Sequence, residues 1–240
     1  MTAPTPGIPE LSADVVLWSA DEPDRVGRPL LVLLHGYGAD ERDLFGLTPY
    51  LPDEFVIAAP RAPLAPSWPA PGYSWYPIDG FEPGEDLGGR SPQPTTDAAS
   101  ALIAWLDVVA GYASAIGLLG FSQGAAVAIQ ALRLQPERFS FVVNLSGYAT
   151  PGALPRDAEL AKLEPPVFWG RGTRDDVIPE ALVAHTTEWL PQHADLSGRV
   201  YHGLTHSVSE PELDDVRAFL EKQLEDHGAA ADSAPPTSIR

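Results

Sequence analysis

The chain has 240 residues, of which 44% are hydrophobic, so it can bury one sizeable core but has no room for a second full domain. Its 33 acidic and 15 basic side chains give a net charge of −18, which repels phosphate backbones and anionic membranes and so argues against nucleic acid as a partner. The absence of cysteine excludes disulfides, thiolate metal sites and cysteine nucleophiles.

The two ends of the chain differ in composition from the middle. Residues 1–12 include several prolines and lack the basic and apolar regions of a secretory signal, so we expect a flexible leader. Residues 227–240 are small, polar and proline-containing, and we expect a disordered tail. Because no apolar run approaches the roughly 20 residues of a membrane span, we expect one domain over 13–226 in a cytoplasmic protein without stable membrane insertion.

Three apolar segments lie at the start of the predicted domain. Residues 14–19 are expected to form an antiparallel edge strand. Residues 29–34 and 55–59 contain continuous apolar runs without alternation, which is typical of strands covered on both faces. The glycine-rich segment 35–40 follows the first of these runs, at the end of a strand where open α/β sheets bind ligands.

Strands and helices alternate along the rest of the chain. The patterns predict helices over 43–51, 96–112, 125–132, 180–190 and 211–223, and strands over 116–119, 139–145, 166–170 and 199–201. Residues 151–163 contain prolines and are expected to form a connection. This alternation predicts an α/β fold with a mostly parallel central sheet, helices on both faces and no separate cap domain.

A long segment over residues 60–94 is rich in proline and glycine and shows no helix or strand pattern. Loops of this length in compact domains are usually functional or disordered, and the aromatic content here argues against disorder. Its aromatic side chains are Trp68, Tyr73, Trp75, Tyr76 and Phe81. The first four of them either line an apolar pocket or cover the core beneath the loop, and the sequence supports both interpretations equally.

The segment Gly120–Gly124 reads Gly-Phe-Ser-Gln-Gly between an apolar strand and a helix. This is the context of a nucleophile elbow, in which a strained turn exposes a serine above the sheet. Glycines two residues before and after Ser122 avoid collisions with the strand and the helix. The alternative interpretation is an ordinary turn that joins a strand to a helix.

A serine nucleophile needs a base to accept its proton, and the base needs an acidic residue to orient it. In this fold the serine comes first in the chain, the Asp or Glu second and the His third. We favour His206 over His202 as the base, because it lies farther out on the last loop and can turn back over the serine. Asp175 and Asp176 both follow a predicted strand, and spacing alone cannot separate them. One oxyanion donor is expected to be the backbone N–H of Gln123, and the other lies in the turn 36–38.

These motifs together resemble the phospholipase/carboxylesterase family of α/β-hydrolases, which includes small bacterial carboxylesterases and acyl-protein thioesterases. The resemblance rests on residues 33–38, 120–124, 175–179 and 203–206, and it extends over about 14–223. It implies an α/β-hydrolase fold. The family's Asp-x-x-Val-Pro motif fits residues 175–179, with Ile178 in place of Val, and it assigns the acid to Asp175.

The resemblance also implies further site residues. It places the second oxyanion donor on Tyr37, between Gly36 and Gly38, and it includes Trp75 and Tyr76, followed by Asp79, in the long loop. It implies a carboxylesterase without a metal or another cofactor, and we expect short- to medium-chain acyl esters as its substrates. Thioesters and lysophospholipids are alternative substrates, a non-catalytic binding protein is an alternative function, and a homodimer is compatible with the sequence.

Overall fold

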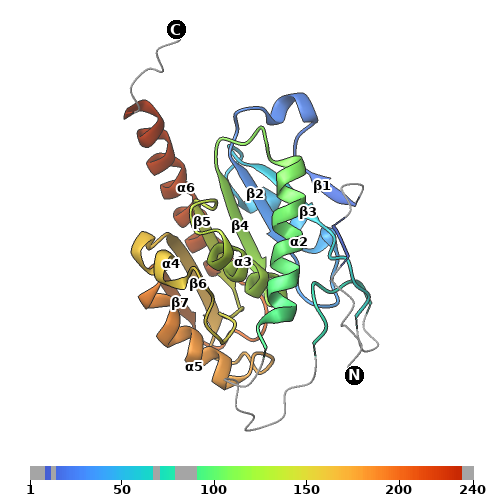
Figure 1. The fold of residues 1–240 in the computed structure, drawn as a ribbon, viewed down its shortest axis with the longest axis vertical. Helices are drawn as coiled ribbons and strands as arrows, with labels where there is room; N and C mark the ends of the chain where they lie inside the picture. Colours follow the sequence, from blue (N-terminus) through green and yellow to red (C-terminus); the bar gives the residue numbers. More distant parts are fainter. Residues whose placement is uncertain (1–8, 12–14, 67–70, 79–90, 234–240) are drawn as a thin grey trace.

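The computed structural model describes residues 9–11, 15–66, 71–78 and 91–233. Seven strands form one sheet in the order β1-β3-β2-β4-β5-β6-β7 (Figure 1). Strand β1 pairs antiparallel with β3, and all other neighbours pair parallel, as the sequence predicts. The strands are β1 (Val16–Trp18), β2 (Leu30–Leu34), β3 (Val56–Pro60), β4 (Ile116–Phe121), β5 (Phe141–Leu145), β6 (Pro166–Gly172) and β7 (Asp195–Tyr201).

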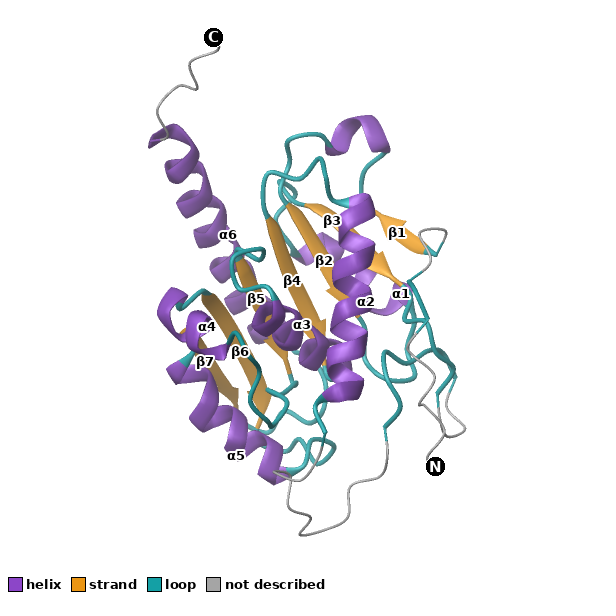
Figure 2. Ribbon diagram, viewed as in Figure 1, coloured by secondary structure: helices purple, strands orange, loops and turns teal. Residues whose placement is uncertain are grey.

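Helices cover both faces of the sheet, which confirms the predicted layers (Figure 2). They are α1 (Glu41–Phe45), α2 (Gln93–Val109), α3 (Gln123–Leu134), α4 (Asp157–Leu163), α5 (Glu180–Trp189) and α6 (Glu210–Ser233). Helices α2 to α5 pack on one face, and α1 and α6 pack on the other. Among the described helices, none is both long and apolar enough to cross a bilayer.

The central strands are buried on both sides because their side chains alternate between two hydrophobic cores. In β2, Leu30, Val32 and Leu34 belong to the core beneath α2 and α3. Leu31 and Leu33 belong to the core beneath α6. Both sets are fully buried, which explains why this strand reads as a continuous apolar run.

Several predicted boundaries were wrong. The helix predicted over 43–51 is divided into α1 and a 3-10 turn over Thr48–Tyr50, because Gly46 ends α1 and Pro49 begins the next turn. The last strand begins at Asp195 instead of 199. Helix α6 continues to Ser233, so 227–233 are helical and not part of a disordered tail. The three alanines at 229–231 favour this extension, because alanine has the highest helix propensity.

The connection predicted over 151–163 contains helix α4. The helix is held by its first residue, Asp157, which accepts hydrogen bonds from the fully buried Arg133 at 2.9 and 2.8 Å. Leu160 on the same helix is buried against the α2–α3 side of the sheet. The helix therefore depends on tertiary contacts that the local proline pattern does not reveal.

Candidate active site

Ser122 lies at the junction of β4 and α3 in a backbone conformation that is strained for any residue except glycine. Its φ of 54° and ψ of −116° fall outside the usual regions for an L-residue, at a cost of about 1–3 kcal/mol. Its backbone N–H donates to the Leu145 carbonyl at 2.9 Å, and its carbonyl accepts from the Ala126 N–H at 3.1 Å. The surrounding strand and helix therefore hold the strained turn in place.

The positions of Gly120 and Gly124, which flank the serine, have no room for a side chain. A Cβ on Gly120 would lie 2.4 Å from the backbone nitrogen of Ala125. A Cβ on Gly124 would lie 2.0 Å from the carbonyl oxygen of Leu34 in β2. Both contacts are far shorter than van der Waals separations, so the helix can approach the sheet this closely only with glycine at these positions.

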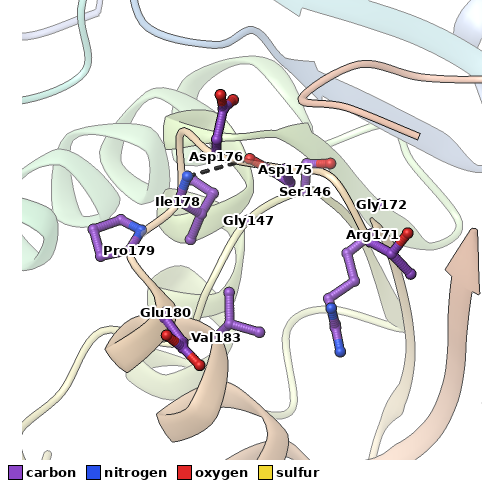
Figure 3. Close-up of a pocket in the computed structure, with 11 residues that line it drawn as sticks. Ser146, Gly147, Arg171, Gly172, Asp175, Asp176, Ile178, Pro179, Glu180 and Val183 are labelled. Atoms are coloured by element: carbon purple, nitrogen blue, oxygen red, sulfur yellow. Dashed lines mark hydrogen bonds between the residues drawn. The ribbon is translucent and has the colours of Figure 1, made fainter. Parts of the chain in front are cut away.

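Three distant side chains meet above this turn. The Ser122 Oγ lies 2.9 Å from His206 Nε2, and His206 Nδ1 lies 2.8 Å from Asp175 Oδ2. The second carboxylate oxygen of Asp175 accepts from the backbone N–H of Val177 at 3.0 Å and from that of Ile178 at 3.2 Å. Figure 3 shows the bond from Ile178. With its carboxylate fixed in this way, Asp175 holds the imidazole with Nδ1–H toward itself and Nε2 toward the serine.

The structure also separates the candidates that the sequence left open. His202 is exposed, four residues before His206 on the loop after β7. Asp176 is exposed as well, although it is adjacent to Asp175 in the chain. The hydrogen-bonded chain therefore contains His206 and Asp175, and it excludes their two sequence neighbours.

The turn after β2 lies directly beside the serine. A Cβ on Gly36 would lie 3.6 Å from the Ser122 Cβ, and Gly38 has a φ of +79°, which favours glycine. The Gly36 carbonyl accepts from His35 Nδ1 at 2.8 Å and from the Ala39 N–H at 3.3 Å. Because a trans peptide is planar, the anchored Gly36 carbonyl fixes the Tyr37 N–H in the opposite direction.

His35 is buried and serves as a neutral bridge in this turn. Its Nε2 accepts from the Ala62 N–H at 3.1 Å, so its proton resides on Nδ1. Burial lowers the pKa of His35 below its usual value of 6.5, which keeps the ring neutral. The ring therefore donates to one loop and accepts from another, and it ties the two loops together.

Trp75 and Tyr76 are buried, with 0% and 5% of their surface exposed. Both belong to the core on the α2–α3 side, so they cover the core, one of the two alternatives that the sequence left open. The Tyr76 hydroxyl lies 2.7 Å from the Tyr148 hydroxyl, and burial raises the pKa of Tyr76. Trp68, Asp79 and Phe81 lie outside the described residues.

Two hollows flank the triad. One of about 280 Å³ lies beside His206 and is lined largely by Leu44, Leu47, Phe121 and Val208. The other, of about 520 Å³, lies beyond Asp175 and is more polar (Figure 3). Its lining includes Ser146, Arg171, Thr173, Asp176, Glu180 and Val183. His206 thus borders a largely apolar hollow, and Asp175 borders a more polar one.

Residues 19–224 match the family model described as phospholipase/carboxylesterase. The chain belongs to this family. The resemblance found in the sequence motifs is thereby confirmed, and it extends across almost the whole α/β domain.

Individual relatives of this phospholipase/carboxylesterase family member include esterases and thioesterases. The chain is 32% identical to acyl-protein thioesterase 1 of Debaryomyces hansenii, over 72% of this chain and 78% of that protein. It is 32% identical to acyl-protein thioesterase 1 of Saccharomyces cerevisiae over 44% of this chain, a match that spans about half (48%) of that relative. The crystal structure of esterase PE8 superposes with a TM-score of 0.68 at 30% identity, covering 82% of this chain and 93% of that one.

Proposed function

We propose that this family member is a carboxylesterase that works through an acyl-enzyme, with Ser122 as nucleophile, His206 as base and Asp175 as the acid that orients the base. The observation that carries the proposal is the continuous hydrogen-bonded chain from Ser122 Oγ through His206 to Asp175. A serine hydroxyl is a weak nucleophile at neutral pH, and a base oriented in this way removes its proton as it attacks. The strained serine backbone supports the same role.

The reaction has two halves. Ser122 Oγ attacks the acyl carbon while His206 Nε2 takes its proton, and the carbonyl oxygen becomes an oxyanion. His206 then returns the proton to the leaving alcohol oxygen as the bond between that oxygen and the acyl carbon breaks. Water, deprotonated by His206, attacks the acyl-enzyme, and the carboxylic acid leaves as Ser122 regains its proton.

The oxyanion would be bound by the backbone N–H groups of Tyr37 and Gln123. Gln123 is the first residue of α3, where a helix offers its own N–H groups no internal partner. The partial positive charge of the helix N-terminus adds to this stabilisation. Each such donor typically stabilises the transition state by about 3 kcal/mol.

The apolar hollow beside His206 supports short- to medium-chain acyl groups. Its volume of about 280 Å³ falls just below the range of about 300–1,000 Å³ that is usual for small-molecule sites. Leu44, Leu47, Phe121 and Val208 would contact the alkyl chain. The polar hollow beyond Asp175 would take the alcohol portion.

Thioester hydrolysis is a second candidate function, and the relatives named acyl-protein thioesterase 1 favour it. The same triad and oxyanion donors act on both bond types, because the attacked atom is an acyl carbon in each. A panel of p-nitrophenyl esters of increasing acyl length, assayed beside the matching acyl thioesters, separates the two activities.

Variants of three side chains test the mechanism. Ser122→Ala and His206→Ala should each lower kcat by about 10³-fold or more and abolish labelling by a fluorophosphonate probe. His202→Ala is the matched control for the base and should retain wild-type activity. If Ser122→Ala folds and still hydrolyses esters at the wild-type rate, or if His202→Ala is inactive while His206→Ala is active, the assignment is wrong.

A further inference from the structure

The side-chain amide of Gln123 is buried and holds a segment of the loop that precedes α2. Its Oε1 accepts from the backbone N–H of Trp75 at 2.9 Å, and its Nε2 donates to the Tyr76 carbonyl at 2.7 Å. Ser74 Oγ lies 3.4 Å from Oε1 and 3.3 Å from Nε2. Both ends of one amide are therefore used on a segment 47 to 49 residues away in the chain.

The segment that Gln123 holds, residues 73–76, is also hydrogen-bonded to the turn after β2. The Trp75 indole N–H donates to the His35 carbonyl at 2.8 Å, and the two rings lie 5.3 Å apart. Tyr73 completes the contact through its backbone, accepting from the Gly38 N–H at 2.9 Å and donating to the Ala39 carbonyl at 2.8 Å. These bonds bracket Tyr37 on both sides.

Gln123 is thus joined to both proposed oxyanion donors. Its own N–H is one donor, and its side chain reaches the turn of Tyr37, the other donor, through Trp75 and Tyr73. The two amides come from different strand ends, on β2 and β4, and backbone pairing between those strands ends at Leu34 and Gly120. Beyond that point, the relative position of the two donors depends on side chains and loops.

We propose that the Gln123 side chain is a positioning residue that sets the separation of the two oxyanion donors. This inference rests on the proposed esterase function and concerns the geometry of its transition state. Donors of this kind act only when they are preorganised at the place where negative charge develops. A displacement of about 1 Å in such a group can lower the rate about 100-fold.

Gln123→Met removes both hydrogen bonds while keeping the backbone N–H and a side chain of similar length. We expect kcat to fall about 10- to 100-fold, with KM changed less than about threefold, because the lost interaction matters mainly in the transition state. The inhibition constant of phenylboronic acid, which forms a tetrahedral adduct with a serine nucleophile, should rise by a factor similar to the fall in kcat.

Gln130→Met is the matched control. Gln130 is a fully buried glutamine on the same helix whose amide donates to Thr96 Oγ1 at 2.8 Å, away from the triad. Gln130→Met should lower the unfolding temperature as Gln123→Met does, because this change also breaks buried hydrogen bonds. Its kcat should stay within about twofold of wild type. Equal losses of kcat in the two variants would overturn the positioning role.

Two further variants extend the test, and the second, Gln123→Glu, keeps the proposal testable if Gln123→Met does not fold. Trp75→Phe retains a ring but loses the hydrogen bond to the His35 carbonyl, so this variant should have a lower kcat. The double variant with Gln123→Met should lose much less activity than the product of the two single losses, because both changes break the same connection. Gln123→Glu should regain activity relative to wild type as the pH falls from 8 to 5.5, because only the protonated carboxyl can donate to the Tyr76 carbonyl. The positioning role would be overturned if the effects of Trp75→Phe and Gln123→Met on kcat multiply. It would also be overturned if the activity of Gln123→Glu relative to wild type does not change with pH.

These results are distinguishable from a failure of the proposed function. An inactive wild-type protein, or an active Ser122→Ala variant, would refute the esterase mechanism itself. An active wild type with an inactive Ser122→Ala variant and an unimpaired Gln123→Met variant would refute only the role of the Gln123 side chain.

Discussion

Glu212 on α6 predicts an unusual dependence of stability on pH. Its side chain is fully buried, and among the described residues neither carboxyl oxygen has a hydrogen-bond partner of normal geometry. The carboxyl packs directly on Gly170, where a Cβ would lie 2.1 Å from Glu212 Oε1. Burial raises the pKa of Glu212 to about 7, Asp215 adds to the rise, and the Ser209 backbone offsets part of it.

The direction of the change in stability with pH depends on which state, folded or unfolded, holds the Glu212 proton more tightly. The folded protein keeps the Glu212 proton up to about pH 7, whereas the unfolded chain releases it near the usual glutamate pKa of 4.5. Rising pH through this window therefore favours the unfolded chain. At about 1.4 kcal/mol for each pH unit of difference, the loss from this one carboxyl reaches about 3 kcal/mol at pH 7 and above.

Glu212→Gln removes this titration with almost no change of shape. Urea unfolding of both proteins at pH 5 and pH 8 gives the free energies to be compared. The advantage of the variant over wild type should grow by about 2–3 kcal/mol between these pH values. Glu225→Gln, an exposed change on the same helix, should show a constant difference. A constant difference for Glu212→Gln as well would show that the folded protein does not hold this carboxyl protonated.

Four other substitutions test the catalytic acid, a buried ion pair and the close packing at the elbow. Asp175→Asn should lower kcat by about 10⁴-fold through loss of the imidazole orientation, whereas Asp176→Asn should change kcat little and act mainly on KM, because Asp176 only lines the polar hollow. Arg133→Met should lower the free energy of unfolding by about 3–5 kcal/mol in urea titrations, because it leaves Asp157 without its cation, and a loss below 1 kcal/mol would contradict the buried pairing. Gly124→Ala should reduce soluble, folded protein as judged by circular dichroism, because its Cβ would lie 2.0 Å from a β2 carbonyl oxygen, and wild-type stability would contradict that contact.

The parts of the molecule that could be predicted from the sequence depend on local physics. Continuous apolar runs such as 29–34 mark strands covered on both faces, and β2 is indeed buried on both. The elbow is recognisable because its glycines are required by atoms only a few residues away or on the adjacent strand. Fold class and the position of Ser122 follow from such short-range constraints.

The parts that could not be predicted depend on contacts between distant residues. Asp175 and Asp176 are neighbours of the same type, so spacing cannot separate them; the family motif favours Asp175, and the folded loop shows that Asp175 faces His206. The burial of Trp75 and the hydrogen bonds of the Gln123 side chain join segments 48 residues apart, so no local pattern reveals them. For Gln123, the sequence indicated the backbone amide but gave no signal for the side chain.

The position of β7 has a consequence for how the protein loses activity. This strand lies at the open border of the sheet, much of it in contact with solvent, and its following loop carries His206. Fraying of that border would carry the imidazole away while the rest of the sheet, including the elbow, stayed folded. Heat inactivation should therefore begin below the temperature of global melting, and turnover is a sensitive reporter of subglobal opening at this edge.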